Sequence, residues 1–295
     1  MQSDSVLKGL AYGACASMIG DVITMPIDVT KTRLQLSGEG GTKVYKNALD
    51  CAMKTARAEG PLALWKGLEP ALWRQCFYGS MRYGLYAPIK NVLAPGVAKE
   101  DMTLGTKMLA GGLSGTLAQA VANPCDLVKV RMIGDGMGAG GAAGAAPRYR
   151  WFLGALHGIS KTEGVGGLYK GLGANVGRAS TLASAEMASY DSIKPLMKAR
   201  FDFDEGLGLH GATAMCSGFI AAFVANPFDV VKSRVMNSSG GVGAEYTGMV
   251  DCFTKTVRNE GVASLWKGFL PAWARVGPRV VIAFVTMEQL RMRFG

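Results

Sequence analysis

The sequence predicts an all-α membrane protein of six transmembrane helices, built from three repeats of about 100 residues each. Two observations carry this prediction. A motif of the form Pro-x-Asp-x-x-Lys-x-Arg occurs three times, beginning at Pro26, Pro124 and Pro227. A longer block also aligns without a gap at 45–74, 149–178 and 246–275. Self-similarity at one period indicates repeated structural units, and this period suits a module of several helices.

The elements recur in one order in each repeat, with limits predicted at 1–98, 99–203 and 204–295. A long apolar segment leads into the Pro motif, and a polar loop, a short amphipathic helix and a second apolar segment follow. The first segments predict membrane spans most clearly. Residues 206–228 contain no Asp, Glu, Lys or Arg, and 23 residues are enough to cross a hydrocarbon core of roughly 30 Å.

The second apolar segments are less uniformly apolar than the first, since each contains several ionisable residues. A globular core is one interpretation of them. Ionisable residues within spans usually face a water-filled cavity or one another, which favours a transport path. These segments are predicted at 70–93, 172–194 and 271–292.

The composition and the residue types present exclude several classes of function. The chain has 295 residues, of which 49% are hydrophobic, and a formal net charge of +10. Its basic residues recur at repeat positions, which argues against nucleic acid as a partner. An enzyme is not supported, because there is no Ser/His/acid set, no phosphate-binding loop and only two histidines, His157 and His210. The six cysteines show no metal-binding spacing.

Each Pro motif is followed by Glu-Gly and by an aromatic-Lys-Gly triplet, and this triplicate pattern resembles the mitochondrial carrier family over essentially the whole chain. The resemblance implies a six-helix barrel with threefold pseudosymmetry in the mitochondrial inner membrane. It also implies three short helices on the matrix side and one central site that is reached alternately from each side. We expect a multi-pass monomer without a cofactor or a metal, with cardiolipin bound at the matrix helices.

The first segments are expected to carry a gate on the matrix side. Their prolines would kink them toward a common axis, where each motif aspartate meets a motif lysine of a neighbouring repeat. Such a ring can open because desolvation offsets the Coulomb gain of a buried pair; a permanent stabilising network is the alternative. The expected pairs are Asp28–Lys129, Asp126–Lys232 and Asp229–Lys31. The gate also includes Pro26, Pro124, Pro227 and Gln35, whose equivalents in the other repeats are Ile133 and Met236.

The resemblance places a second gate, on the cytoplasmic side, at a Tyr/Phe-Asp/Glu-x-x-Lys/Arg motif in each second segment. The motif is complete at 190–194 and lacks its aromatic residue at 287–291. Ala87 replaces the acid at 86–90. At most two of three bridges are therefore expected. The residues of this gate are Tyr86, Lys90, Tyr190, Asp191, Lys194, Glu288 and Arg291.

The substrate site is expected where the second segments depart from the repeat, because an asymmetric solute needs an asymmetric site. In the family, substrate contacts fall on the even-numbered helices. Converging guanidinium groups bind carboxylate or phosphate through paired hydrogen bonds. Arginines that snorkel or pair structurally are the alternative. The expected site residues are Arg82, Arg178, Ala179, Arg275, Glu186 and Arg279.

Stretches such as RQCFYGSMRYGLY and EMASYDSIK resemble the branch of uncoupling proteins and dicarboxylate/oxoglutarate carriers, and most closely plant-type uncoupling proteins. The first hypothesis is therefore transport of small anionic metabolites, such as malate, oxoglutarate, oxaloacetate or aspartate, against phosphate. The second is a regulated proton leak, with Glu186 and the arginines binding a purine nucleotide as inhibitor. The third is a carrier fold kept as a structural subunit of a membrane assembly. Arg279 is unusual for either subgroup of the branch.

Overall fold

Helices make up all the regular secondary structure in the part of the chain that the computed structural model describes. The structure describes residues 2–37, 44–95, 104–135, 149, 151–201, 207–238 and 246–275, with six single residues between 278 and 292. The segment predicted at 271–292 therefore lies largely outside the described residues.

The helices recur in the order that the repeats predict. The first repeat contains α1 (Gln2–Leu36), α2 (Ala48–Glu59), the 3₁₀ helix η2 (Pro61–Trp65) and α3 (Leu68–Leu93). The second contains α4 (Leu104–Gly134), α5 (Phe152–Gly167) and α6 (Leu172–Phe201). The third contains α7 (Leu207–Asn237), α8 (Met249–Glu260), η3 (Val262–Trp266) and α9 (Phe269–Ala274).

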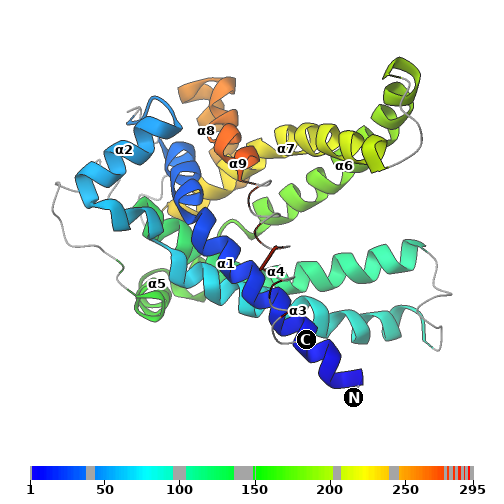
Figure 1. Ribbon diagram of the computed structural model, residues 1–295. Coiled ribbons are helices and arrows are strands. Elements are labelled where there is room, and N and C mark those ends of the chain that lie inside the picture. The colour runs from blue at the N-terminus through cyan, green and yellow to red at the C-terminus, as the bar shows by residue number, and fades with distance from the viewer. Residues whose placement is uncertain are drawn as a thin grey trace.

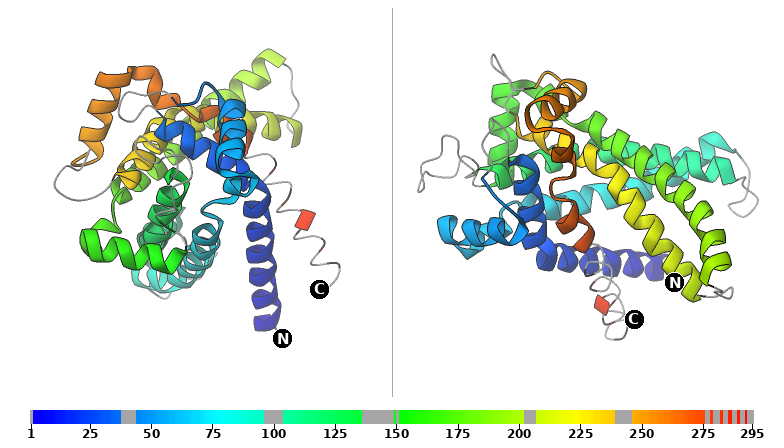
Figure 2. Two further views of the ribbon diagram at one scale, coloured as in Figure 1. Left: turned by 90° about the vertical axis from the view of Figure 1, so that its left-hand side faces the viewer. Right: turned by 90° about the horizontal axis from the view of Figure 1, so that it is seen from above.

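The long helices run between two distinct ends of the molecule. Helix α3 lies beside α4, and α6 lies beside α7 (Figures 1 and 2). The short helices α2, α5 and α8 gather at one end, which we call the closed end. The start of α1, the end of α3 with the start of α4, and the end of α6 with the start of α7 lie at the other, which we call the open end (Figure 1).

The repeated Glu-Gly pair ends α2 and α8 and interrupts α5. Helix α2 begins at Asn47, whose side chain accepts a hydrogen bond from the Asp50 amide at 2.8 Å, as expected of an N-cap. It ends at Gly60, where φ is 88°. Gly261 ends α8 with φ 81°, and Gly164 interrupts α5 with φ 71°. Glycine adopts this left-handed region without steric cost, so the repeated pair is explained by backbone geometry.

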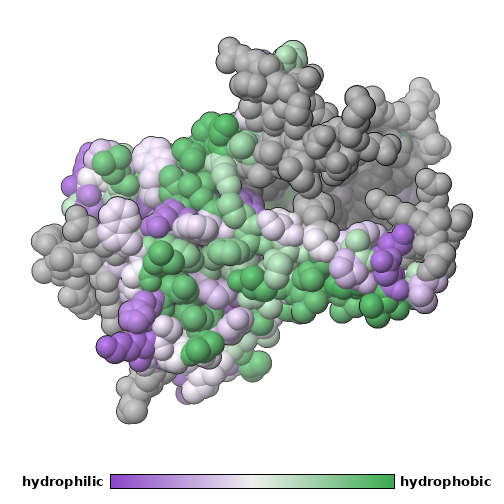
Figure 3. Space-filling model, turned by 90° about the horizontal axis from the view of Figure 1, so that it is seen from below, coloured by the Kyte–Doolittle hydropathy of each residue, from purple (hydrophilic) through white to green (hydrophobic). Residues whose placement is uncertain are grey.

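Exposed apolar side chains follow the outer faces of α4 and α7 at intervals of four residues, which is one face of a helix. Figure 3 shows one side of the molecule, where hydrophobic residues cover the middle and hydrophilic residues gather toward the ends. Within the described residues, one helical segment, Met215–Asn237, is long and apolar enough to cross a membrane. The exposed residues of these two faces are Leu109, Leu113, Leu117, Val121, Met215, Phe219 and Phe223.

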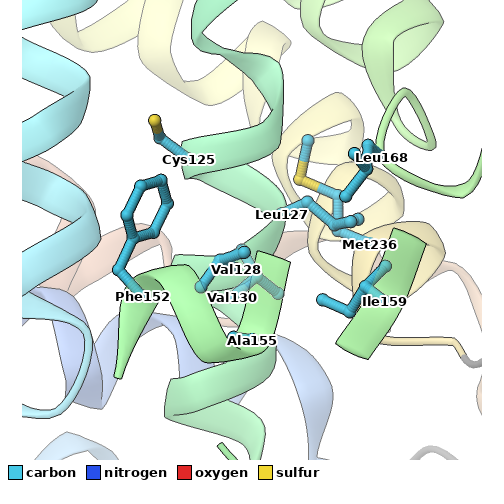
Figure 4. Close-up of a cluster of buried hydrophobic side chains, with 9 residues drawn as sticks. All are labelled: Cys125, Leu127, Val128, Val130, Phe152, Ala155, Ile159, Leu168 and Met236. Carbon is cyan, nitrogen blue, oxygen red and sulfur yellow. The ribbon is translucent and has the colours of Figure 1, made fainter. Parts of the chain in front are cut away.

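The apolar core near the closed end joins the second repeat to the third. On α5, Phe152, Ala155 and Ile159 share one face and pack against α4 (Figure 4). Met236, near the end of α7, is fully buried in the same cluster. The spacing of three and four residues explains why α5 turns this face inward.

Two glycines allow the repeats to approach closely. Gly171 and Gly268 follow the aromatic-Lys pair in their repeats and have φ values of +79° and +78°. A Cβ on Gly171 would lie 2.7 Å from Met236 Cγ. On Gly268 it would lie 3.0 Å from the carbonyl oxygen of Lys31. Gly268 therefore approaches the backbone of the first repeat, and Gly171 a side chain of the third repeat, more closely than a residue with a Cβ would allow.

Replacing Gly268 with alanine is expected to lower the free energy of unfolding by about 1–3 kcal/mol, because it combines a left-handed backbone with a backbone clash. A thermal melt in detergent measures this effect. Gly158→Ala is the matched control, since Gly158 lies within α5 and a Cβ there meets no atom within 4 Å. Equal melting temperatures for the two variants would contradict the close approach at Gly268.

Candidate functional site

The three long helices that carry the Pro motifs surround a polar cavity. Pro26, Pro124 and Pro227 lie inside α1, α4 and α7, and a proline within a helix removes a backbone hydrogen bond and favours a kink. The motif aspartates and lysines follow within two turns and line a cavity of about 290 Å³. The Pro motifs thus bring their charged residues to one place.

An aspartate–lysine ring lines this cavity, and each of its ion pairs joins two different repeats. The side chains of the aspartates are almost buried, with 7–13% of their surface exposed. The three pairings predicted from the sequence are confirmed, while the role of the ring as a gate stays a prediction. The N–O distances are 2.9 Å for Lys129–Asp28, 3.0 Å for Lys232–Asp126 and 2.8 Å for Lys31–Asp229.

Each ring aspartate also binds an arginine from a second-segment helix. Arg74 Nε lies 2.7 Å from Asp126 Oδ1. In each case Oδ2 binds the lysine and Oδ1 binds the arginine. Each carboxylate is therefore shared by two cations. The other two arginine pairs are Arg178–Asp229 and Arg275–Asp28.

Arg74, and not Arg82, lines this cavity together with Arg178 and Arg275, while the substrate role expected of Arg82 stays a prediction. Arg82 follows Arg74 by eight residues on α3, which is about 12 Å along a helix axis. Its side chain is exposed, and its Cζ lies 5.8 Å from the centroid of the Tyr78 ring. The sequence did contain the signal, since Arg74, Arg178 and Arg275 close the three aligned blocks.

The other expected site residues lie next to Arg178, toward the open end, or outside the described residues. Ala179 is exposed beside Arg178. Tyr86 and Lys90 are half-buried on α3, and Ala87 is exposed. The cytoplasmic gate therefore stays a prediction. The expected site residues that lie outside the described part of the chain are the side chains of Glu186, Tyr190, Asp191 and Lys194, and residues Arg279, Glu288 and Arg291.

Two polar contacts in the cavity wall were not anticipated. Asp21 accepts a hydrogen bond from Gln75 Nε2 at 2.6 Å. Ser233 Oγ donates to Gln35 Oε1 at 2.7 Å. With Asp21 included, six cationic and four acidic side chains line the cavity, which gives a formal charge of +2. The cavity therefore suits a small anion.

A second tier of charges, the Arg–Glu–Lys clusters, lies at the closed end. In each cluster the arginine of the Pro motif binds both oxygens of the glutamate of the Glu-Gly pair. The lysine of the aromatic-Lys-Gly triplet binds the same carboxylate. The clusters explain why these motifs recur together. They are Arg33–Glu59–Lys66, Arg131–Glu163–Lys170 and Arg234–Glu260–Lys267.

The same arginines link each repeat to the next around the axis. Their Nε atoms donate to main-chain carbonyl oxygens that lie in another repeat. The first repeat binds the second, the second binds the third, and the third binds the first. The links are Arg33 to Ile133 at 3.2 Å, Arg131 to Met236 at 3.0 Å and Arg234 to Gln35 at 3.1 Å.

The glutamates of the clusters make the free energy of unfolding depend on pH. Burial alone would raise the pKa values of Glu59 and Glu260, but the adjacent arginine and lysine outweigh burial and hold both pKa values below the ordinary 4.5. A carboxyl whose pKa is lower in the folded state stabilises the fold above its unfolded pKa, and this contribution is lost as the pH falls through the folded pKa.

We therefore expect the melting temperature in detergent to fall as the pH drops below about 4.5. In Glu59→Gln/Glu260→Gln the pH dependence should be weaker, and stability at pH 7 should be lower. Melting curves across this range measure both effects. Parallel pH profiles for the variant and the wild type would show that these carboxyls contribute nothing to the acid sensitivity.

The chain is similar to known proteins over almost its whole length. The family model described as "Mitochondrial carrier protein" matches residues 2–96, 100–201 and 204–295. Mitochondrial uncoupling protein 1 of Arabidopsis thaliana is 40% identical over 292 residues, covering 97% of this chain and 93% of that protein. The "Probable mitochondrial 2-oxoglutarate/malate carrier protein" of Dictyostelium discoideum is 37% identical, covering 98% of this chain and 90% of that protein.

Proposed function

This chain belongs to the mitochondrial carrier family, and from that premise we propose that it exchanges small dicarboxylates across the mitochondrial inner membrane by alternating access. It would act as a multi-pass monomer, with six helices in a threefold barrel of repeats 1–98, 99–203 and 204–295. The exposed apolar faces of α4 and α7 and the apolar segment of α7 support a membrane setting. The closed end then faces the matrix.

One observation carries the proposal. Arg74, Arg178 and Arg275 face the cavity and bind the aspartates that also hold the ring together. A solute carboxylate that binds one of these arginines competes directly with a ring aspartate. Because arginine forms paired hydrogen bonds with any carboxylate, the solute can replace the aspartate as its partner. Binding of the solute then weakens the closure of the matrix side.

This exchange of partners keeps the barrier to opening moderate. Removing one partner from a buried ion pair costs about 3–5 kcal/mol, because the remaining charge is left uncompensated. An incoming dicarboxylate would supply a new carboxylate to the arginine, while the released aspartate keeps its lysine. The free-energy cost of opening is then larger for the empty carrier than for the loaded one. Exchange requires this difference, because the empty carrier must not change its state easily.

Uptake of labelled malate into proteoliposomes tests this function, with and without malate or phosphate inside. Uptake that requires an internal anion supports exchange. Absence of uptake under every loading condition would contradict the proposal. In parallel, proton flux with and without GTP tests the second candidate.

That second candidate is a proton leak inhibited by purine nucleotides. Three relatives named mitochondrial uncoupling proteins, from Arabidopsis thaliana, are 39–40% identical to this chain. Asp21 adds a fourth carboxylate to the cavity wall, and it has no acidic equivalent at Gln119 or Ala222. The second candidate rests on this additional carboxylate and on the relatives named as uncoupling proteins. Proton flux that GTP suppresses, without malate exchange, would favour this candidate.

Cardiolipin is proposed to bind beside α8 in preference to α5. A cavity of about 270 Å³ at the start of α8 is lined by Lys170 and by Gly248, which gives the helix no side-chain cap. Free backbone N–H groups at a helix start attract phosphate. At α5 the Phe152 amide instead donates to Glu69 Oε2 at 3.0 Å, so the chain's own carboxylate occupies the equivalent position.

A further inference from the structure

A tryptophan replaces the hydrogen bond that Pro26 removes from α1. In a helix each carbonyl oxygen accepts from the amide four residues farther on, and proline has no amide hydrogen to donate. Pro26 therefore leaves the carbonyl of Val22 without its usual partner. The indole Nε1 of Trp65 donates to this carbonyl oxygen at 3.0 Å. The side chain thus supplies the donor that the main chain lacks.

The third repeat contains the same arrangement at the proline of α7. Pro227 leaves the carbonyl of Phe223 without an amide donor, and Trp266 Nε1 donates to that oxygen at 3.0 Å. The Trp266 ring also stacks on the Phe223 ring, with 5.1 Å between the centroids. Trp65 and Trp266 are the aromatic residues of two aromatic-Lys-Gly triplets. These triplets therefore carry an indole donor beside the lysine of the Arg–Glu–Lys cluster.

The two carbonyls lie where water is a poor substitute for the lost amide. Val22 and Phe223 are 38% and 44% exposed, and neither is one of the described residues that line the polar cavity. In the proposed membrane setting, such positions face lipid, which offers no hydrogen bonds. An unpaired carbonyl costs more free energy in an apolar medium than in water. The indole donors therefore stabilise the kinked helices.

The proline of α4 has a different support. Tyr169 is the aromatic residue of the second triplet, and a phenol ring has no N–H. The Tyr169 side chain makes no hydrogen bond within the part of the chain that the structure describes. Instead, Gln119 Nε2 donates to Asp126 Oδ2 at 3.0 Å. These two residues lie on either side of Pro124, so the hydrogen bond bridges the proline without replacing the missing amide.

We propose that Trp65 and Trp266 are positioning residues, which fix the bends of α1 and α7 by replacing the hydrogen bonds that the prolines remove. Each proline lies two residues before a ring aspartate, Asp28 or Asp229. The direction of the helix at that point decides whether the carboxylate meets its lysine and its arginine. The expected effect on exchange rests on the proposed function, whereas the expected effect on stability does not.

A double-mutant cycle tests the replacement of the hydrogen bond directly. Pro227→Ala restores an amide donor to the Phe223 carbonyl, so Trp266→Phe should have a smaller effect in that background. We expect Trp266→Phe to lower the melting temperature in detergent by about 4 °C in the wild type and by about 1 °C in Pro227→Ala. Trp65→Phe with Pro26→Ala is the parallel cycle in the first repeat.

Trp73→Phe is the matched control for loss of ring area. Trp73 is 43% exposed, against 38% for Trp65, and its ring stacks on Phe77. Its indole N–H has no hydrogen-bond partner among the described residues. The change in melting temperature that Trp73→Phe causes should therefore be the same with and without Pro26. Additive effects in both tryptophan–proline cycles would overturn the inference.

A gain of stability provides a test that leaves the prolines in place. Asn123 donates to the main-chain carbonyl that precedes Tyr169 at 2.9 Å, and Asn226 donates to the one that precedes Trp266 at 2.8 Å. The two triplets therefore lie alike beside α4 and α7. Tyr169→Trp should place an indole N–H at the carbonyl of Ala120 and raise the melting temperature by about 2 °C. If the proline variants do not fold, an unchanged or lower melting temperature in Tyr169→Trp would overturn the inference.

Exchange kinetics distinguish positioning of the ring from a role in stability alone. Trp65→Phe should lower the maximal rate of malate exchange about fivefold and leave the half-saturating concentration within about twofold, because Trp65 is not one of the described residues that line the cavity. Trp73→Phe should leave both values within about twofold of the wild type. In a protein that exchanges malate, an unchanged maximal rate in Trp65→Phe would overturn the positioning role. If the cycles show coupling and the wild type exchanges no malate, the replacement of the hydrogen bonds stands and the proposed function fails.

Discussion

Arg178→Gln is expected to reduce malate exchange by about 100-fold or more, because it removes paired hydrogen bonds to a carboxylate within the cavity. It also leaves Asp229 with Lys31 alone, so the ring is altered as well. Arg178→Lys keeps the charge and loses the planar fork, so we expect a loss of about tenfold. Initial rates in proteoliposomes measure both, with a melting curve for each variant as the control for folding.

The equivalent changes at Arg74 and Arg275 should have the same effect, because each of the three arginines binds Oδ1 of a ring aspartate. Wild-type rates in all three lysine variants would rule out paired hydrogen bonding. Wild-type rates in all three glutamine variants would rule out the substrate site and favour the structural-subunit hypothesis.

Lys129→Ala is expected to slow exchange by about tenfold or more while the protein still inserts into the membrane. The change leaves Asp28 paired with Arg275 alone, so closure of the matrix side becomes weaker. Initial rates of exchange are the measurement, and reconstituted protein is quantified to confirm insertion. Lys31→Ala and Lys232→Ala should give the same result, since each lysine has one ring aspartate as its partner.

The double variant Asp28→Lys/Lys129→Asp tests whether the pair itself matters. It restores opposite charges at the two positions and should recover part of the lost rate. Recovery should be incomplete, because the new ammonium group lies beside Arg275, which binds Asp28 in the native protein. Normal exchange in all three alanine variants would show that the ring is not a gate.

The ring pairs could be predicted because the same motif occurs three times, and a threefold arrangement fixes which aspartate meets which lysine. The position of Arg74 could not be predicted by looking for departures from symmetry, since Arg74 obeys it. Arg82 departs from symmetry but lies two helical turns away. Which turn of a helix lines a cavity depends on how the helices pack, and no single segment encodes that packing.

The Arg–Glu–Lys clusters show a different limit of prediction from the sequence. The sequence showed that Glu59 and Lys66 recur at fixed positions, but their shared partner, Arg33, lies on another helix. A contact between helices depends on the angle and distance at which they pack, so sequence spacing alone does not reveal it. The hydrogen bond between Gln35 and Ser233 was missed for the same reason, because 198 residues separate them.

That hydrogen bond lies where the polypeptide itself provides no connection. Peptide links join the first repeat to the second and the second to the third, and they hold those neighbours at high effective concentration. The third and first repeats meet without such a tether. Ile133 and Met236 meet their neighbours through apolar packing, whereas Gln35 binds Ser233 across the untethered junction. In a circular permutant that moves the chain break to another junction, this directional contact would no longer lie at the break.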